Sequence, residues 1–544
     1  MFATIIKSAA AVRRLLPLGA ATVGALLATA VQAAAPGIGS TNGTPATFNM
    51  NAEPAFLTQP DGQSIYSWGY GCASGSSPTF LPNVAAAITT TAFCSTMQVP
   101  GPTLIVHEGD LVTVTLTNNL PAAAGNTSIL FPGFNVTSTG GVQGLLTQEA
   151  APGGTVTYTF TASTPGTRAY YSGTQGDLQV EMGMYGAIIV LPKAANIPAA
   201  CTTGLHASNL AAESHWGESD FRLAPAAYAN ANTCYDREYL FQWSEMDPTI
   251  HNQALAQVND PVRVAACKTG PATPGCSLNV PTEPYHPAYF MINGRSMPDD
   301  MDPNYAPQYP HQPYNGNPHM HPGEITLLRI VGTGRWQHPF HEHANHVRIL
   351  ARDGNLILAP DGQSLAGPLM FTTTTTPGLA MDGLFYFTGK GLNWDMYGHN
   401  PSSGDTLAKL PCTPDANGYN TGDPTAVNYF EWCQDHNKPM QAFPFGDLPT
   451  GGPMTLPDPN LFVNGTWYGG SPYLGPDATT RAVGATGTTP PSGTVVNPPN
   501  TEAAFAFMWH SHNEREITTN NIFPGGMLMM MLVDSREFVI DESN

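Results

Sequence analysis

The sequence is poor in charged residues, and above all in basic ones. Asp, Glu, Lys and Arg make up 11% of the 544 residues, against about 25% in an average soluble protein. Lys and Arg together number 20 and Asp and Glu 40, which gives a formal net charge of −20. A chain of this charge repels DNA and RNA, and no basic cluster offsets the repulsion. Nucleic-acid binding is therefore excluded.

Long apolar runs are also scarce, and the one that stands out lies at the N-terminus. Three basic residues, Lys7, Arg13 and Arg14, precede the apolar run LLPLGAATVGALLATAV. Small residues follow this run. This order is typical of a secretory signal peptide, which we predict for residues 1–35. No other run approaches the roughly 20 apolar residues that a membrane-spanning helix needs. We therefore expect a periplasmic or extracellular protein with no membrane span.

The cysteines lack the spacing of a redox or haem motif. None of the eight forms a CxxC pair or the CxxCH signature of c-type haem attachment. An even number in an exported chain predicts disulfides, most simply between sequential neighbours, although other pairings stay open. The eight are Cys72, Cys94, Cys201, Cys234, Cys267, Cys276, Cys412 and Cys433.

Long helical patterns are missing, whereas Gly and Pro are abundant. The 55 glycines and 51 prolines interrupt the chain too often for long helices, which predicts an all-β fold. In PGPTLIVHEGDLVTVTLTNNLP, apolar and polar residues alternate on both sides of Gly109 and Asp110, which predicts a half-buried hairpin. With the strand-like runs GGTVTYTFTAS and MYGAIIVLP, this hairpin predicts an antiparallel sandwich in a first domain, residues 36–192.

A second strand-rich region follows a segment of little periodicity. Residues 193–234 are rich in Ala, Asn and Gly, and we predict a linker there. The second domain, residues 235–544, contains strand-like runs such as REYLFQWSEMD, GEITLLRIVG and AFAFMWHSHNE. Residues from about 395 to 500 have few apolar runs, and we interpret them as a long loop inserted in this domain.

Two pairs of histidines have the spacing of metal ligands on strands. His341 and His343 form one His-x-His pair, and His510 and His512 form the other. Because alternate side chains of a strand share a face, two such strands side by side would bring four imidazoles together. Imidazole nitrogens suit copper, zinc or iron. The alternative is that these side chains are exposed or hydrogen-bonded without a metal.

Neighbouring residues carry weaker predictions. His319 and His321 form a third pair, but their stretch is polar and rich in Pro and Gly, so a surface role is expected. The methionines of GGMLMMMLVD favour a buried strand over a soft copper(I) site. Glu342 is offset by one from the histidines and should point away from them. Glu514 and Glu516 share the parity of the second pair, and they are our candidate catalytic groups, as ligand orienters or a proton source.

At these residues the chain resembles the multicopper oxidases, over most of its length after the predicted signal peptide. PGPTLIVHEGDLVTVTLTNNLP is similar to a hairpin of the family's first domain. HPFHEHANHVRIL resembles the copper motif HPxHxH, and MWHSHNE resembles the motif HCHxxxH. The resemblance implies copper as cofactor and tandem cupredoxin-like Greek-key β-sandwiches. The two expected domains are similar to the two-domain branch of the family, which implies a homotrimer.

The resemblance also implies roles for single residues. His338 would bind type-1 copper, His341 the type-2 copper, and His343, His510 and His512 the type-3 pair. These five histidines are therefore the predicted metal ligands.

The sequence departs from the family's motifs in both domains. The cysteine whose thiolate binds type-1 copper corresponds to Ser511, and the last histidine of HCHxxxH corresponds to Glu516. Because type-1 copper depends on that thiolate, we predict no normal type-1 site. In the first domain, the motifs HWHG and HSH correspond to residues 130–133 (LFPG) and 171–173 (YSG), so four further ligands are absent.

Two functions remain open at this point. The first is a secreted copper-binding oxidoreductase that lacks a normal type-1 site and takes electrons from a small-molecule reductant or a redox partner protein. The second is a non-catalytic copper-binding or scaffold protein that has kept the fold. The retained His-x-His pairs favour the first, and the missing thiolate favours the second.

Overall fold

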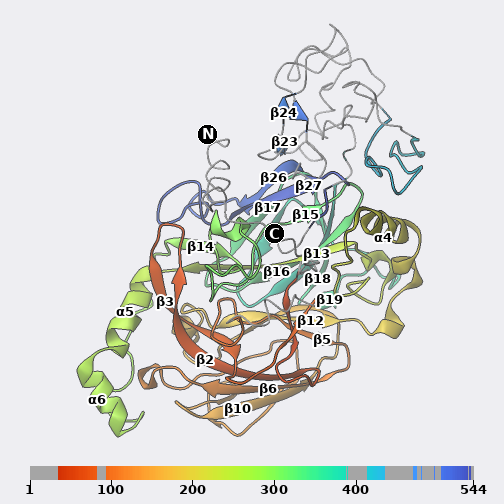
Figure 1. Cartoon of the computed structure of the whole chain (residues 1–544). Coiled ribbons are helices and arrows are strands. Elements are labelled where there is room, and N and C mark those ends of the chain that lie inside the picture. The colour runs from red at the N-terminus through yellow and green to blue at the C-terminus, as the bar shows by residue number, and fades with distance from the viewer. Residues whose placement is uncertain are drawn as a thin grey trace, which may run out of the picture.

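The computed structural model describes residues 35–82, 93–387, 389, 413–434, 470–473, 479–480, 495–496, 504–536 and 538–540. Residues 1–34 of the predicted signal peptide and most of the predicted loop 395–500 lie outside these ranges. In the part of the chain that is described, strands dominate and build two sandwiches, which lie one below the other in Figure 1.

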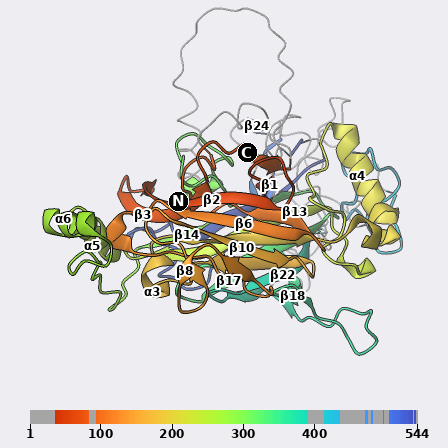
Figure 2. The same ribbon diagram turned by 90° about the horizontal axis from the view of Figure 1, so that it is seen from below.

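The first sandwich consists of two five-stranded sheets, with the orders β11-β12-β5-β1-β4 and β3-β2-β6-β10-β7. Figure 2 shows β2, β6 and β10 side by side as one layer. The strands are β1 (Gly37–Ser40), β2 (Thr47–Thr58), β3 (Ser64–Cys72), β4 (Thr79–Leu81), β5 (Leu104–His107), β6 (Leu111–Asn118), β7 (Thr137–Thr139), β10 (Thr155–Thr161), β11 (Gly166–Tyr171) and β12 (Tyr185–Leu191), beside a small hairpin of β8 (Val142–Gln143) and β9 (Gln148–Glu149).

The predicted hairpin around Gly109 is wrong, although both of its strands exist. β5 lies between β12 and β1 and is parallel to both, whereas β6 lies in the opposite sheet between β2 and β10. Val112, Val114 and Leu116 of β6 are buried and alternate with more exposed threonines, as the sequence predicts. Both faces of β5 are buried, with Leu104 and Val106 in one apolar cluster and Ile105 in another, so its apolar residues are consecutive. The turn thus joins two layers, and the sheets are mixed rather than antiparallel.

The second sandwich consists of the sheet β14-β13-β16-β22-β18-β19, with β20 beside β18, and the sheet β15-β27-β26-β17-β21, with β23 beside β26. The strands are β13 (Arg237–Met246), β14 (Tyr289–Ile292), β15 (His319–Met320), β16 (Ile325–Gly332), β17 (His338–Glu342), β18 (Val347–Arg352), β19 (Asn355–Leu356), β20 (Leu369–Met370), β21 (Thr372–Thr375), β22 (Ala380–Tyr386), β23 (Gly470–Tyr473), β26 (Ala504–Ser511) and β27 (Leu528–Asp534). β24 (Thr479–Thr480) and β25 (Val495–Val496) pair with each other.

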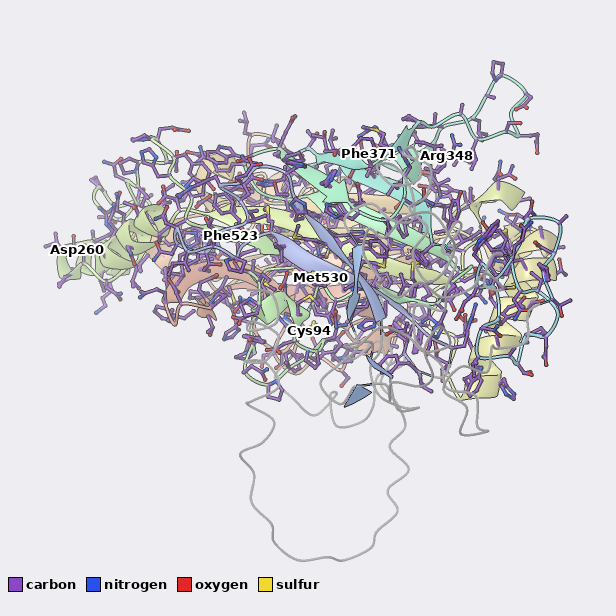
Figure 3. All side chains as sticks on the ribbon, turned by 90° about the horizontal axis from the view of Figure 1, so that it is seen from above. Cys94, Asp260, Arg348, Phe371, Phe523 and Met530 are labelled. Carbon is purple, nitrogen blue, oxygen red and sulfur yellow. A yellow bond between two sulfur atoms is a disulfide. The ribbon has the colours of Figure 1, made fainter. Side chains whose placement is uncertain are left out.

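The methionines near the C-terminus belong to the core of the second sandwich. Met527, Met529 and Met531 pack with aromatic residues of the facing sheet and are buried. Met530, which Figure 3 labels, is half-buried and packs on the other face of the same strand, against Ala506 and Leu532. The prediction of a buried, Met-rich strand is confirmed for these residues.

Three helices interrupt the all-β pattern. α4 (Gly204–Trp216) lies inside the segment predicted as a linker, and α5 (Pro248–Val258) and α6 (Pro261–Thr269) follow β13. α5 and α6 each begin with an Asp-Pro pair, in which the Asp accepts a backbone N–H as N-cap and the Pro is the first helical residue. One further turn of helix, α3 (Gly176–Gln179), and five 3-10 turns complete the described helical structure: Ala122–Ala124, Ala194–Asn196, Ala199–Thr202, Ala231–Thr233 and Asp299–Met301.

Three disulfides join sequential cysteines, as predicted: Cys72–Cys94, Cys201–Cys234 and Cys267–Cys276. Cys433 is also disulfide-bonded, and the predicted partner, Cys412, lies outside the described residues. Among the residues that the structure describes, no helix combines the length and the apolar character needed to cross a bilayer.

Polar contacts join the two sandwiches. The hydroxyl of Thr167 in β11 donates to Asp382 in β22 at 2.6 Å, and the hydroxyl of Tyr185 in β12 donates to Ser244 in β13 at 2.7 Å. All four side chains lie in the interior. β17 and β26 are therefore fixed within a body that includes both sandwiches, and these two strands carry the histidine pairs.

Candidate metal centre

The two predicted histidine pairs meet on one face of β17 and β26. These strands are antiparallel, and their register places His341 directly opposite His510. His343 lies two residues beyond His341 on the same face, just after β17 ends. The strand pairing thus gathers side chains that are almost 170 positions apart in the sequence.

Three of the four imidazoles form a compact group. One ring nitrogen from each of His341, His343 and His510 lies within 4.8 Å of the other two. The Nε2 atoms of His343 and His510 are 3.3 Å apart. His341 is 2% exposed, His510 6% and His343 9%, so the group lies just below the surface.

His512 lies at the rim of this group. Its ring centroid is 4.7 Å from that of His341 and 5.5 Å from that of His510. Its side chain is 51% exposed, and its Nδ1 is 3.7 Å from a carboxylate oxygen of Glu514, which is itself 82% exposed. The fourth predicted ligand is therefore close to the others but faces solvent.

Burial and crowding keep the imidazoles of His341 and His510 neutral. The pKa of His341 falls to about 3, because burial disfavours its charged form and His343, His510 and His512 would repel it. Burial also lowers the pKa of His510. At neutral pH these rings therefore have unprotonated nitrogens, which are the atoms that bind metals.

Hydrogen bonds at the outer ring atoms orient two of the rings. Nδ1 of His341 is 2.6 Å from the hydroxyl oxygen of Thr372 in β21, and Nδ1 of His510 donates to the backbone oxygen of Ser511 at 2.7 Å. In His510, Nε2 then faces the cluster. Such outer partners are usual for histidines that bind metals. No sequence pattern indicates Thr372, because its contact with His341 depends on the pairing of β17 with β21.

His338 does not join the cluster, because it lies on the opposite face of β17. Its Nε2 is 2.8 Å from Glu245 in β13, and its Nδ1 is 2.9 Å from Glu516. Burial works against a charge on this ring, but the hydrogen bonds to Glu245 and Glu516 outweigh burial and raise its pKa to about 9. His338 is thus an imidazolium between two carboxylates at neutral pH, and neither ring nitrogen has a lone pair for a metal.

Glu516 and Ser511 lie beside His338. The Ser511 hydroxyl donates to Oε2 of Glu516 at 2.5 Å, and Asn513 donates to Oε1 at 2.9 Å. Glu516 is buried and shares the face of His338 rather than that of His512. The chain turns after Ser511, where β26 ends, so the strand parity on which the sequence argument for Glu516 relied does not extend to it.

The other acidic and histidine residues have structural partners. Glu342 points into the core, as predicted, and burial raises the pKa of its carboxyl group well above its usual range. The expectation of a surface role for His319 and His321 is wrong, since both are buried. Nδ1 of His319 contacts Asp534 at 2.7 Å, and Nε2 of His321 contacts Glu218 at 2.8 Å. A polar, Pro-rich stretch is buried here because acidic partners satisfy its imidazoles.

Residues 83–195 match a family model described as Multicopper oxidase. Over these residues the chain is similar to the multicopper oxidases. It is 36% identical to laccase abr2 of Aspergillus fumigatus over 99 residues, which are 18% of this chain and 16% of the laccase. It is 38% identical to the copper-containing nitrite reductase of Pseudomonas chlororaphis over 98 residues, which are 18% of this chain and 26% of the reductase. The chain thus matches no more than about a quarter of the length of these relatives.

Two solved structures of copper proteins are similar to a large part of the chain at low identity. A blue copper oxidase from Nitrosomonas europaea is 15% identical, with a TM-score of 0.41, over 89% of this chain and 85% of the oxidase. A copper nitrite reductase from the same organism is 18% identical, with a TM-score of 0.34, over 63% of this chain and 84% of the reductase.

The first-sandwich positions that the sequence resemblance predicts to correspond to copper ligands are filled by packing. Leu130 and Tyr171 pair through a backbone hydrogen bond of 2.7 Å, from the nitrogen of Leu130 to the oxygen of Tyr171. A Cβ atom added to Gly173 would lie only 2.7 Å from a side-chain carbon of Leu130. The leucine side chain therefore occupies the space beside Gly173 that a larger residue would need.

Proposed function

We propose that the protein is a copper-binding oxidoreductase of the multicopper oxidase superfamily without a normal type-1 copper site. The observation that carries this proposal is the group of His341, His343 and His510, whose ring nitrogens lie within 4.8 Å of one another. His512 would complete the ligand set from the rim, since its ring is 4.7 Å from that of His341.

The geometry of the described residues fits a metal of this kind. Metal–imidazole distances of about 2.0–2.1 Å put two nitrogens of a tetrahedral site roughly 3.3 Å apart. The Nε2 atoms of His343 and His510 have that separation. An all-imidazole ligand set suits copper, zinc or iron, and copper is the metal in the names of the nitrite reductase relatives.

Copper bound there would exchange single electrons with a small-molecule reductant or a redox partner protein. The chain's own residues provide the ligands, keep them neutral and, through Thr372 and Ser511, hold two of their rings in place. His512 faces solvent, so a small molecule can approach from its side. An accessible side is what distinguishes a catalytic metal site from a closed structural one.

The absence of a blue, type-1 centre is part of the proposal. The three positions that correspond to type-1 ligands do come together, as His338, Ser511 and Glu516. They offer an imidazolium, a hydroxyl and a carboxylate, whereas the type-1 site depends on a thiolate. None of the cysteines in the described part of the chain is free.

Metal analysis of variants tests the site. After copper loading and desalting, the wild-type chain should retain copper, and elemental mass spectrometry should find it lost from His341→Ala and His510→Ala. His346→Ala is the matched control, because His346 is half-buried nearby against Phe371 but outside the group. Equal copper in all four proteins would overturn the proposal. A strong blue absorption band in the wild type would overturn the absence of a type-1 site.

The second candidate is a non-catalytic copper-binding or scaffold protein, favoured by the packing of Leu130 against Gly173 where other superfamily members have ligands. Turnover separates the two candidates. A phenol as reductant, with oxygen or nitrite as acceptor, should be consumed by the loaded protein and not by His510→Ala. Retained copper without turnover of any such pair would favour the scaffold.

We further propose export, domain limits and assembly. The three disulfides support an oxidising compartment, the periplasm or the cell exterior, reached through a signal peptide at residues 1–35. Residues 36–192 and 235–544 would be the two cupredoxin-like domains, joined by 193–234. N-terminal sequencing of the exported chain tests the first point, and light scattering tests for a homotrimer.

A further inference from the structure

Of the three clustered histidines, His343 is the one that the pairing of β17 with β26 does not include. The pairing ends at the residue before it, whereas His341 and His510 lie opposite each other within the ladder. Ladder hydrogen bonds therefore fix the backbone of these two histidines. His343 begins the turn His343–His346, which leads from β17 to β18 and which we call the ligand turn. Contacts outside the ladder must hold this turn in place.

Trp509 holds the ligand turn from the core side. Its indole Nε1–H donates to the backbone oxygen of His343 at 3.0 Å. Trp509 is fully buried, and its ring packs against Phe385 and Phe340, with centroids 4.9 and 5.9 Å apart. Because a ring confined in this way cannot follow a moving turn, the hydrogen bond fixes the turn. Trp509 directly precedes His510 on β26, so a single strand sets the positions of ligands from two segments.

The backbone of the ligand turn is strained and is anchored at two further points. Ala344 has a φ of 86°, in the left-handed region that residues other than glycine adopt at a cost in free energy. This alanine is fully buried in the core of the second sandwich. The side-chain amide of Asn345 donates to the backbone oxygen of Tyr386 in β22 at 3.0 Å. Such strain persists only where the surroundings enforce it, and it is frequent at ligand sites.

We propose that Trp509 is a positioning residue that sets the separation of His343 and His510 before a metal binds. The Nε2 atoms of these two histidines are 3.3 Å apart. The indole N–H of Trp509 ties the backbone of the first to the strand that carries the second. Ligands that are already in place in the metal-free protein lose little conformational freedom on binding, which strengthens binding. The positioning stands on these contacts, and its use for copper rests on the proposed function.

Trp243 provides a matched control for Trp509. Both residues are fully buried in the core of the second sandwich, and both rings pack against Phe340. Among the described residues, however, the indole nitrogen of Trp243 has no hydrogen-bond partner. Trp243→Phe and Trp509→Phe therefore remove the same volume from one core, and only Trp509→Phe also removes a hydrogen bond to the ligand turn.

Crystal structures of the metal-free, full-length variants test the positioning without any activity. In Trp509→Phe we expect the Nε2 atoms of His343 and His510 to move apart by about 1 Å or more, a displacement that matters for a metal site. In the wild type and in Trp243→Phe the separation should stay at 3.3 Å. An unchanged separation in Trp509→Phe would overturn the proposal. Equal widening in both variants would overturn it too, because a loosened core would then explain the change.

Copper binding gives a second readout of the same variants. In competition with a chelator, Trp509→Phe should bind copper about tenfold more weakly or worse, as is usual when a group that orients a ligand is lost. Its electron paramagnetic resonance spectrum should differ from that of the wild type, because the copper hyperfine splitting depends on ligand geometry. Trp243→Phe should match the wild type in both measurements, and a match by Trp509→Phe would overturn the proposal.

A second variant covers the case in which Trp509→Phe does not fold. Asn345→Ala removes the other hydrogen bond that anchors the ligand turn, at a half-buried position. It should widen the separation of His343 and His510 and weaken copper binding in the same direction. No change in either measurement would overturn the proposal.

The two measurements separate this proposal from the proposed function. A widened separation in metal-free Trp509→Phe, with a wild type that retains no copper, would support the positioning and overturn the copper-binding oxidoreductase. An unchanged separation in a chain that binds copper through His341 and His510 would do the reverse.

Discussion

His338 donates one ring proton to Glu516, so the position that resembles a type-1 copper ligand carries a salt bridge with an N–O distance of 2.9 Å. The second ring proton is bound by Glu245 at 2.8 Å. A positive imidazolium between two buried carboxylates leaves one net negative charge in the interior. The imidazolium of His338 thus links β17 with β13 and with the turn after β26, as a metal ion with one ligand from each of these three segments would.

Replacing His338 by glutamine should destabilise the protein strongly. The change leaves Glu245 and Glu516 as buried carboxylates without a cation, and losing one partner of a buried ion pair costs about 3–5 kcal/mol. Denaturant unfolding should show this loss as a lower midpoint. His346→Gln, at a half-buried site outside the salt bridge, should stay within about 0.5 kcal/mol of the wild type. A loss below 1 kcal/mol in His338→Gln would contradict the charged state of the ring.

The free energy of unfolding should depend on pH through the titration of His338. The folded-state pKa of His338 is about 9, above the ordinary value of 6.5. Its contribution to stability is therefore fully present below about pH 6.5 and is lost as the pH rises through 9. The shift corresponds to about 3 kcal/mol. Because other groups also titrate in this range, the wild type is compared with His338→Gln from pH 6 to 10. The difference between their free energies of unfolding should shrink as the pH rises.

Copper should stabilise the folded protein through the histidine group. A ligand at about 100 times its dissociation constant adds roughly 2.7 kcal/mol when it binds only the native state. Thermal unfolding with and without copper, followed by a chelator, should show a rise in midpoint that the chelator reverses. The rise should be absent in His510→Ala and retained in His346→Ala. A rise of the same size in all three proteins would mean that copper binds elsewhere.

The double change Ser511→Cys and Glu516→His should create a blue copper site. Oε2 of Glu516 already contacts Nδ1 of His338 at 2.9 Å and accepts a hydrogen bond from the Ser511 hydroxyl at 2.5 Å. Two imidazoles and a thiolate in one plane are the ligand set of blue copper proteins. The copper-loaded double variant should gain an intense visible absorption band, and Ser511→Cys alone should give a weaker one or none. A colourless double variant that still binds additional copper would mean that the geometry does not suit a type-1 site.

The sequence was sufficient for the strands and for the main histidine group. Alternation predicted β6, and the two-residue spacing predicted that His341 and His343 share a face, because both patterns are local. The partners of β5 and β6 are not local, since they are set by β12 and β2, and the predicted hairpin was therefore wrong. The helices α5 and α6 did have local signals, the two Asp-Pro pairs, which the prediction passed over.

The environment of His338 was beyond prediction from the motif. Its partner Glu245 is 93 residues away, in a strand of the facing sheet, and no spacing rule connects them. Glu516 was named for the wrong reason, because strand parity ends at Ser511. The burial of His319 and His321 depended on Asp534 and Glu218, which are distant in sequence as well.

The two faces of β26 border different electrostatic environments, and consecutive residues of the strand point into one or the other. His510 faces the neutral imidazoles, and Ser511 faces the charged interior around His338. Because side chains alternate with a period of two, deleting or inserting a single residue before Trp509 would exchange the two faces. The histidines would then enter the ionic interior, and the serine would line the proposed metal site. The separation of the histidine group from the buried charge thus depends on the register of a single strand.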